Sequence, residues 1–312
     1  MSQSDTAVAG GSTPLPEGSL AQLAEHHGLK RAIARPAIGP YLHQLWERRH
    51  FIRTYATSRN ISKYSDSMLG QLWQVLTPLL NAAIYFVMFG IILGTQGDVD
   101  NFAAFLITGM FVFTYTQRSV MGGSRAIASN LSLIRALHFP RAALPLAYTL
   151  QEFQQLIVSM AVLMVIIPIT GETPTFYWLL VPVALALQTL FNMGAGLAMA
   201  RVGATLRDVS QLLPFIMRTW LYASGVFFSI PSRLKQAHAP EWVSWILEFN
   251  PATVFIDLMR GLLITSYRVP KPGYGPPPDM TRIWLFALFW AVFALVVGFW
   301  YFWRAEERYG RG

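Results

Sequence analysis

Two long apolar segments flank a basic stretch that runs from Arg118 to Phe153 and reads RSVMGGSRAIASNLSLIRALHFPRAALPLAYTLQEF. Several arginines occur in this stretch before its first acidic residue, Glu152. Short loops rich in Lys and Arg stay on the cytoplasmic side of a membrane. We therefore expect this loop to face the cytoplasm and to fix the topology of the segments around it.

The composition is typical of a membrane protein. Hydrophobic residues make up 54% of the 312 residues and charged residues only 13%, and several apolar runs are too long for a soluble core. The net charge of +8 is dispersed between these runs, so it indicates topology rather than a nucleic-acid surface. The absence of cysteine excludes disulfides, thiolate metal sites and a cysteine nucleophile.

Six apolar segments predict an all-α polytopic membrane protein, because each is long enough to cross a hydrocarbon core of about 30 Å. The predicted spans are residues 71–93, 102–121, 144–169, 176–200, 209–230 and 283–303. Six spans place both ends of the chain on the same side, and the basic residues near both ends favour the cytoplasm.

The segments outside the spans differ in character. Residues 1–40 are rich in Ser, Gly, Ala and Pro and predict a disordered cytoplasmic tail. Residues 41–70 begin with the aromatic and basic run YLHQLWERRHFIRTYATSR, which predicts an amphipathic helix on the membrane interface. Residues 304–312 are expected to form a second cytoplasmic tail.

The segment EWVSWILEFNPATVFIDLMRGLLITSY, residues 241–267, is apolar but is interrupted by Asn250 and Pro251 and by charged residues. Proline breaks a helix because it lacks an N–H donor. Two short helices in a re-entrant external hairpin between the fifth and sixth spans fit this pattern. A further crossing would move the basic C-terminal tail outside.

Within the basic loop, Ile127, Leu131, Ile134 and Leu137 recur at helical spacing, with polar residues on the remaining surface. The pattern predicts a short amphipathic cytoplasmic helix between the second and third spans. Two interpretations stay open on the pattern alone: the helix lies on the membrane interface, or it docks on a partner.

Four blocks of the sequence resemble the ABC-2 permeases that export polysaccharides and polyol phosphates. They read SMLGQLWQVLTPLL, NLSLIRALHFPRAALPL, RVGATLRDVSQLLP, and YASGVFFSIP followed by LEFNPATVFIDLMRGLL. The resemblance implies a coupling helix that sits on an ATPase subunit. It also implies a permease in a bacterial plasma membrane that pairs with a second copy of itself and with two ATPase subunits. Its substrate would be a polyprenyl-diphosphate-linked polymer, such as O-antigen, a teichoic-acid-like polymer or a cell-wall galactan.

The loops and the resemblance together give three groups of candidate functional residues. Coupling to the ATPase is expected to involve Arg125, Asn130, Leu131, Ile134, Arg135, Arg207 and Asp208. The candidate substrate path contains Trp73, Tyr85, Phe89, Arg218, Trp220, Tyr222 and Phe228. The candidate external gate contains Asn250, Pro251 and Arg260.

The path residues have structural alternatives. Aromatic side chains in spans generally pack against neighbours or lipid, and the position of Trp73 favours an interfacial anchor over a substrate contact. Arg218 lies in the middle of the fifth predicted span, where an arginine costs about 2.5 to 3.5 kcal/mol to insert, so it needs a partner or water. That partner is either the anionic phosphate of the substrate or Glu152.

The sequence contains no G-x-x-x-x-G-K-[ST] phosphate loop, so ATP and Mg²⁺ are expected on the partner subunit and no cofactor or metal on this chain. The chain is thus expected to be a permease and not an enzyme. Two other classes stay open: an ABC-2 exporter of a drug or small lipid, and an integral-membrane glycosyltransferase or polymerase. The latter needs acidic catalytic residues, for which the external candidates are Asp98, Asp100, Glu241, Glu248 and Asp257.

Overall fold

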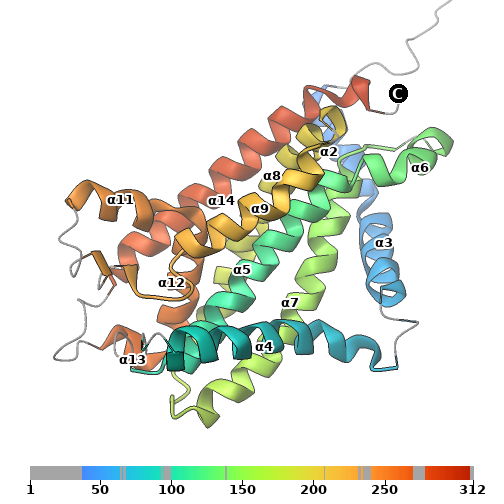
Figure 1. Cartoon of the computed structure of the whole chain (residues 1–312). Helices are drawn as coiled ribbons and strands as arrows, with labels where there is room; N and C mark the ends of the chain where they lie inside the picture. Colours follow the sequence, from blue (N-terminus) through green and yellow to red (C-terminus); the bar gives the residue numbers. More distant parts are fainter. Residues whose placement is uncertain are drawn as a thin grey trace, which may run out of the picture. The chain divides into compact units, whose positions relative to one another are not determined.

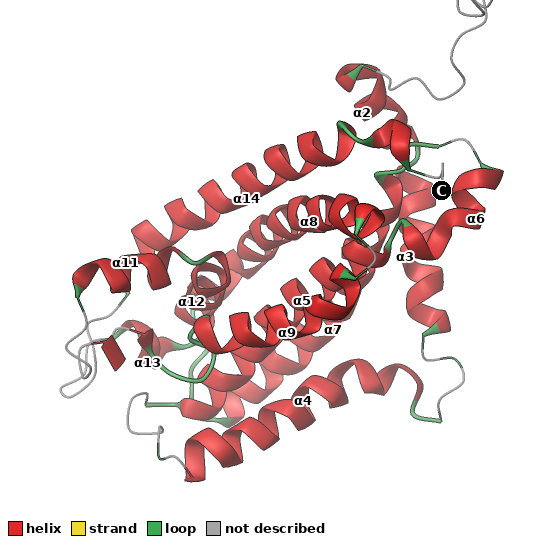
Figure 2. Ribbon diagram, turned by 45° about the horizontal axis from the view of Figure 1, so that its top comes forward, coloured by secondary structure: helices red, strands yellow, loops and turns green. Residues whose placement is uncertain are grey.

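The computed structural model describes residues 37–63, 65, 68–92, 94, 100–137, 139–206, 208–230, 233–234, 240–269 and 278–309. Within these residues every regular element is a helix, as the ribbon views show (Figure 1, Figure 2). Most of the predicted N-terminal tail, together with Arg207 and Asp98, lies outside the described residues.

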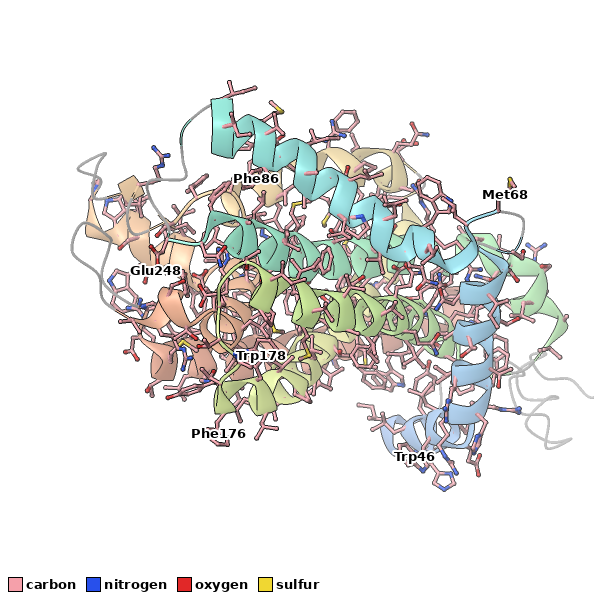
Figure 3. All side chains as sticks on the ribbon, turned by 90° about the horizontal axis from the view of Figure 1, so that it is seen from below. Trp46, Met68, Phe86, Phe176, Trp178 and Glu248 are labelled. Carbon is pink, nitrogen blue, oxygen red and sulfur yellow. The ribbon has the colours of Figure 1, made fainter. Side chains whose placement is uncertain are left out.

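The predicted interfacial segment consists of two helices, α2 (Ile38–Glu47) and α3 (Arg49–Ser62), which meet at Arg48. Helix α3 lies crosswise to the following helix α4 (Trp73–Tyr85), and Trp46 lies at the outer edge of α2 (Figure 3). A short turn, η1 (Gly70–Leu72), leads into α4.

The long helices follow the predicted spans closely. They are α4 (Trp73–Tyr85) with its π-helical extension η2 (Phe86–Ile92), α5 (Phe102–Arg125), α7 (Ala143–Ile169), η5 (Phe176–Leu180) with α8 (Val181–Thr205), and α14 (Met280–Trp303). Among the described residues, four segments are long and apolar enough to cross a membrane: Trp73–Ile92, Ala143–Ile169, Phe176–Thr205 and Met280–Trp303. The protein is therefore an integral membrane protein.

Helix α5 lies at the centre of the bundle. Most of its side chains are buried, and α7, α8, α9 (Val209–Ala223) and α12 (Pro251–Leu263) all pack against it. Its position explains why it is less apolar than its neighbours, since contacts within the protein satisfy polar groups such as the Tyr115 hydroxyl, which donates to Thr189.

Glycines allow α8 and α14 to approach closely. A Cβ atom on Gly194 would lie 2.1 Å from the carbonyl oxygen of Ala294, and one on Gly298 would lie 2.0 Å from the carbonyl oxygen of Gly194. Small residues at such crossings let helix backbones approach in membranes, where apolar burial alone does not drive helix association. The pair Gly194 and Gly298 therefore determines how α8 packs on α14.

The predicted fifth span is helical over only part of its length. Helix α9 (Val209–Ala223) has 15 residues, which corresponds to about 22 Å. The prediction of a helix to Ile230 is wrong, because Gly225 adopts a positive φ of 68° that ends the helix. The chain then turns inward, and Val226 and Phe227 are fully buried.

Among the residues that the structure describes after position 240, the chain forms the short helices α11 (Glu241–Phe249), α12 (Pro251–Leu263) and α13 (Thr265–Arg268). The break between α11 and α12 falls at Asn250 and Pro251, as the sequence predicts. The Asn250 side chain caps α12 by accepting a hydrogen bond from the Ala252 N–H at 3.1 Å, and proline is favoured at the first helical position. Helix α12 is almost entirely buried against its neighbours.

Candidate functional site

The predicted cytoplasmic helix consists of two pieces, η4 (Ala128–Asn130) and α6 (Leu131–Ala136). Ile127 and Ile134 are buried in an apolar cluster at this end of the bundle. Ser132 and Arg135 are exposed, and so is Leu137, which was wrongly predicted on the apolar side because α6 ends at Ala136 and Leu137 is extended. The apolar side of the helix thus packs inward, and its other side is an open surface.

Asn130 is buried, although the pattern predicted it on the polar surface of this helix. Its side-chain oxygen accepts a hydrogen bond from the Tyr55 hydroxyl at 2.5 Å. Its amide nitrogen donates to the carbonyl oxygen of Ala126 at 2.7 Å and to the Tyr148 hydroxyl at 3.3 Å. Asn130 therefore joins the start of α6 to α3 and α7, and its burial explains why the predicted helix is divided there.

Polar side chains connect α3 to α7. The guanidinium of Arg59 lies over the ring of Tyr148, with Cζ 4.1 Å from the ring centroid, and its Nε donates to Gln151 at 3.2 Å. Gln154 donates to the Thr57 hydroxyl at 2.9 Å. The sequence reasoning missed this interface, although the glutamines of an otherwise apolar span were a signal for it.

The two predicted cytoplasmic contacts lie close together. Arg125, at the end of α5, donates to the carbonyl oxygen of Ser210 at 3.5 Å. Ser210 lies in the first turn of α9, two residues after Asp208, and both Arg125 and Asp208 are exposed. The structure thus places Arg125 beside the second predicted contact, whereas Arg207 is outside the described residues.

Three of the predicted path residues surround one buried ring. The ring centroids of Tyr85, Phe89 and Tyr222 lie 4.7, 4.5 and 5.4 Å from that of Phe227. We call these four rings the aromatic cluster. Phe227 was not among the predicted path residues, although it adjoins Phe228. Arg218 is exposed on α9 one turn before Tyr222.

The other predicted path residues lie elsewhere. The Trp220 indole N–H donates to the side-chain oxygen of Asn250 at 2.8 Å, and its ring meets Phe113 edge-on. Trp73 lies in the first turn of α4 and is half-buried. Trp220 therefore has a structural partner in the predicted gate, and it does not belong to the aromatic cluster.

Of the two partners that the sequence left open for Arg218, Glu152 pairs with other residues in the structure. The carboxylate of Glu152 lies 3.9 Å from Lys63 Nζ and 4.0 Å from Arg118 Nη1. Glu152 and Arg118 border a cavity of about 20 Å³ between the middle of α4 and helices α5 and α7, a volume sufficient for one water molecule. Glu152 thus finds its countercharges on α3 and α5.

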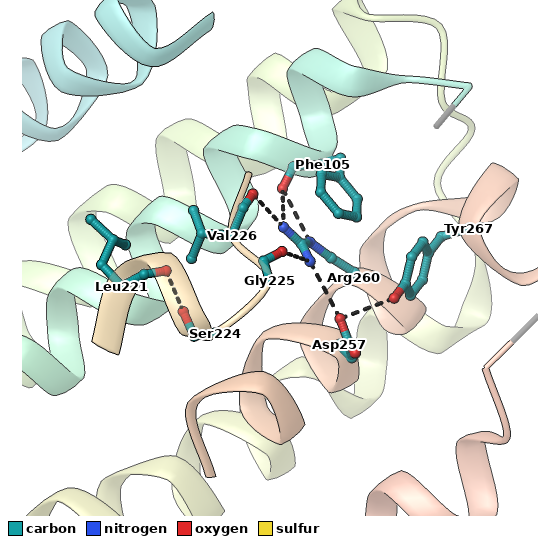
Figure 4. A network of polar contacts seen from close by, with 8 residues as sticks. All are labelled: Phe105, Leu221, Ser224, Gly225, Val226, Asp257, Arg260 and Tyr267. Carbon is teal, nitrogen blue, oxygen red and sulfur yellow. Dashed lines mark hydrogen bonds and ion pairs between the residues drawn. The ribbon is translucent and has the colours of Figure 1, made fainter. Parts of the chain in front are cut away.

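The guanidinium of Arg260 joins three segments (Figure 4). Arg260 is 1% exposed, and it donates to the carbonyl oxygens of Phe105 at 3.1 Å, Gly225 at 2.9 Å and Val226 at 2.9 Å. It also pairs with Asp257 at 3.3 Å. The carboxylate of Asp257 accepts a second hydrogen bond from the Tyr267 hydroxyl at 2.9 Å. Arg260 therefore fixes the turn after α9 against α5 and α12.

Glu172, in the short turn between α7 and η5, has a structural role that sequence reasoning missed. Its carboxylate accepts hydrogen bonds from the backbone N–H groups of Thr265 at 2.8 Å and Ser266 at 3.2 Å, and from the Ser266 hydroxyl. A carboxylate at a helix N-terminus satisfies N–H groups that lack partners within the helix. Glu172 thus caps α13 from a distant segment.

In the parts of the chain that the structure describes, no group of three or more His, Asp or Glu side chains is arranged to hold a metal ion. The buried charged side chains have structural partners, as Arg260 and Glu172 illustrate. The apolar helices, the buried central helix and the short helix α6 define a polytopic helical membrane protein with an exposed helix surface at one end.

Comparison with known proteins identifies the family. Residues 52–264 match the ABC-2 type transporter family, and the chain belongs to that family. The resemblance seen in the sequence is thereby confirmed.

Several relatives align with this chain at low sequence identity, and each alignment covers most of the relative's length. The chain is 27% identical to the O-antigen export system permease protein RfbA of Klebsiella pneumoniae over 205 residues, 65% of this chain and 76% of the relative. It is 25% identical to RfbA of Myxococcus xanthus over 74% of this chain and 85% of the relative. It is also 25% identical to the polysialic acid transport protein KpsM of Escherichia coli over 66% of this chain and 78% of the relative.

Proposed function

We propose that this chain is the permease subunit of an ABC exporter that moves a lipid-linked polysaccharide outward across a bacterial plasma membrane. ATP hydrolysis on a separate subunit drives the transport. The family match and the relatives named as O-antigen and polysialic acid transporters support this function. The structural observation that carries the proposal is that α6 exposes one side to its surroundings, while the hydrogen bonds of Asn130 hold its start against α3 and α7.

The proposed topology has six crossings. Helix α9 and the buried segment after it form the fifth crossing, and α11 and α12 form a re-entrant external hairpin. The end of the bundle that holds α2, α6 and the last described residues faces the cytoplasm, because the arginines of the loop around α6 are expected to stay inside.

The proposed docking surface for the ATPase consists of Ser132, Arg135 and Leu137, with Arg125 and Asp208 as a second contact. The charged and polar residues supply specificity at the rim, and Leu137, 52% exposed, supplies an apolar contact. The ATPase subunits carry ATP and Mg²⁺. Two permease chains and two ATPase subunits form the complete exporter.

The aromatic cluster and Arg218 form the proposed substrate path. Aromatic rings stack on sugar rings without requiring one linkage, which suits a sliding polymer. The exposed guanidinium of Arg218 suits the phosphates of a lipid carrier. A second copy of the chain is proposed to cover the exposed side of α9 and to complete the path.

Two observations weigh against the polymerase alternative. Glu248 forms an ion pair with Arg282, and Asp257 is bound by Arg260 and Tyr267. A catalytic acid must be available to the reacting groups. The carboxylates of Glu248 and Asp257 instead bind other side chains of the helical bundle.

Co-purification from the native membrane tests the proposal. A tagged wild-type permease is expected to capture a soluble ATPase in equal number, and the double variant Arg135→Glu, Leu137→Ala is expected to lose it without loss of permease from the membrane. The matched control Arg53→Glu, Leu42→Ala changes the same residue types at exposed positions of α3 and α2 and should retain the ATPase. A wild-type preparation that is reproducibly free of ATPase in mild detergent would overturn the proposal.

A further inference from the structure

The two ends of the described chain meet beside the loop that connects α6 to α7. The residues that make this contact are Tyr41 of α2, Arg141 and Ala142 at the start of α7, and Glu306 of the short turn η6 (Glu306–Arg308). We call these four residues the terminal clasp. Figure 1 and Figure 2 show α2, α6 and the C-terminal segment at the same end of the bundle.

Hydrogen bonds close the terminal clasp into a ring. Glu306 accepts from the Tyr41 hydroxyl at 2.9 Å with one carboxylate oxygen and from the Arg141 N–H at 3.0 Å with the other. The Tyr41 hydroxyl accepts from the Ala142 N–H at 3.1 Å. The Arg141 guanidinium donates to the backbone oxygen of Glu306. The contact thus uses both oxygens of one carboxylate.

The ring is buried. Tyr41 is 1% exposed and Glu306 is 7% exposed, and Tyr41 also packs against Phe299 of α14. A carboxylate removed from water needs such partners, because an unpaired buried charge is costly. Segments near the end of a domain are poorly ordered unless specific contacts hold them. The buried contacts of Glu306 therefore give the C-terminal segment a defined place in the fold.

The start of α7 depends on this contact. Ala142 precedes the first turn of α7 and has no capping side chain of its own. The first N–H groups of a helix lack partners within the helix and attract negative charge. The Tyr41 hydroxyl, 101 residues distant in sequence, supplies a partner for the N–H of the N-cap residue Ala142. Glu306, 165 residues distant, binds the N–H of the preceding residue, Arg141.

The terminal clasp lies directly after α6. Helix α6 ends at Ala136, and the residues that follow lead to Arg141. On its other side α6 begins at Asn130, which Tyr55 and Tyr148 bind. A displacement of α6 must therefore act on Asn130 at one end and on the terminal clasp at the other.

We propose that Glu306 is a positioning residue for coupling, which transmits the displacement of α6 to α14 and α2 through the terminal clasp. This inference rests on the proposed docking of an ATPase on α6. It adds the C-terminal segment to the coupling apparatus. Without Glu306 the ATPase still docks and hydrolyses ATP, but α14 no longer follows α6.

The test uses the complete exporter in its native strain and purified from it. Glu306→Ala is expected to reach the membrane, to capture the ATPase at the wild-type ratio and to hydrolyse ATP within about twofold of wild type, while glycan at the cell surface falls at least about tenfold. Glu306→Gln keeps the volume and one acceptor, so it should restore part of the export. The control Glu47→Gln removes an exposed carboxylate of α2 and should change none of these quantities.

If Glu306→Ala does not accumulate in the membrane, Tyr41→Phe provides the same test, because it removes only one hydroxyl group from the terminal clasp. The double variant of Tyr41→Phe and Glu306→Gln should be no worse than the poorer single variant, since both act in one ring. Export at the wild-type level per permease molecule in these variants would overturn the inference. A loss of export in proportion to a loss of captured ATPase would also overturn it, because the defect would then lie in docking. A wild-type chain that captures no ATPase would instead overturn the proposed function.

Discussion

The guanidinium of Arg260 lies over the ring of Phe105, with Cζ 3.2 Å from the ring centroid, and also donates to the backbone oxygen of the same residue. One side chain of α12 thereby contacts both the backbone and the ring of a residue on the central helix. Because the same guanidinium binds the oxygens of Gly225 and Val226, the turn after α9 cannot move without breaking it. Arg260 therefore fixes the turn after α9 against the central helix α5.

Arg260→Lys is expected to destabilise the protein despite the retained charge. A lysine has one nitrogen, which cannot reach three carbonyl oxygens on two segments, whereas the planar fork of arginine does. Each buried carbonyl left unpaired costs about 1–3 kcal/mol. Thermal unfolding in detergent should show a clearly lower midpoint for Arg260→Lys, and Arg53→Lys at an exposed position should match wild type. Equal midpoints for both variants would show that the hydrogen bonds of Arg260 do not determine stability.

Gly298→Ala is expected to disrupt the crossing of α8 and α14. The added Cβ would lie 2.0 Å from the backbone oxygen of Gly194, so the helices must separate, and overpacking of this kind costs about 1–3 kcal/mol or more. The yield of monodisperse protein measures the effect. Gly39→Ala is the control, because a Cβ there has no heavy atom within 4 Å. A normal yield of Gly298→Ala would mean that the two helices tolerate a wider separation.

Asn130→Ala should loosen α6 from its base. The substitution removes the acceptor of the Tyr55 hydroxyl and leaves buried groups unpaired, at a cost of about 1–3 kcal/mol. Because Tyr55→Phe breaks the same hydrogen bond, the two substitutions together should cost less than the sum of the single effects. Thermal unfolding of the single and double variants provides the measurement, with Ser132→Ala on the exposed side of α6 as control. Strict additivity would contradict a shared contact.

Long apolar runs and local breaks made much of the fold predictable. The helix Met280–Trp303 coincides almost completely with the predicted span 283–303, because length and hydropathy alone identify such a segment. The break at Asn250 and Pro251 was also readable, since asparagine caps a helix and proline begins one. By contrast, the end of α9 at Ala223 depends on the backbone of Gly225, which a run of apolar residues concealed.

Contacts between distant segments were not predictable from local patterns. Asn130 looked like a surface residue because periodicity counts polarity and not partners, yet Tyr55 lies 75 residues before it. Local patterns singled out neither Glu172 nor Glu306, although Glu172 caps α13 from a distant segment and Glu306 binds the Arg141 N–H just before α7. Among the predicted path residues, Tyr85, Phe89 and Tyr222 pack around Phe227. Arg218 is exposed on α9, one turn before Tyr222. The roles of these residues in transport stay predictions.

Glu306 should give the protein a distinct pH dependence. Burial raises the pKa of its carboxyl group above the ordinary 4.5, against the opposing effect of its hydrogen bonds. A raised pKa in the folded state means that the stability contributed by this group is fully present below about pH 4.5 and is lost as the pH rises through the folded pKa. Glu306→Gln is neutral throughout, so the unfolding midpoint of wild type relative to this variant should fall across that window. Midpoints recorded in detergent from about pH 4 to about pH 8 measure the difference. A flat difference for Glu306→Gln, or a rise with pH, would contradict a buried carboxyl group that the fold prefers to keep protonated.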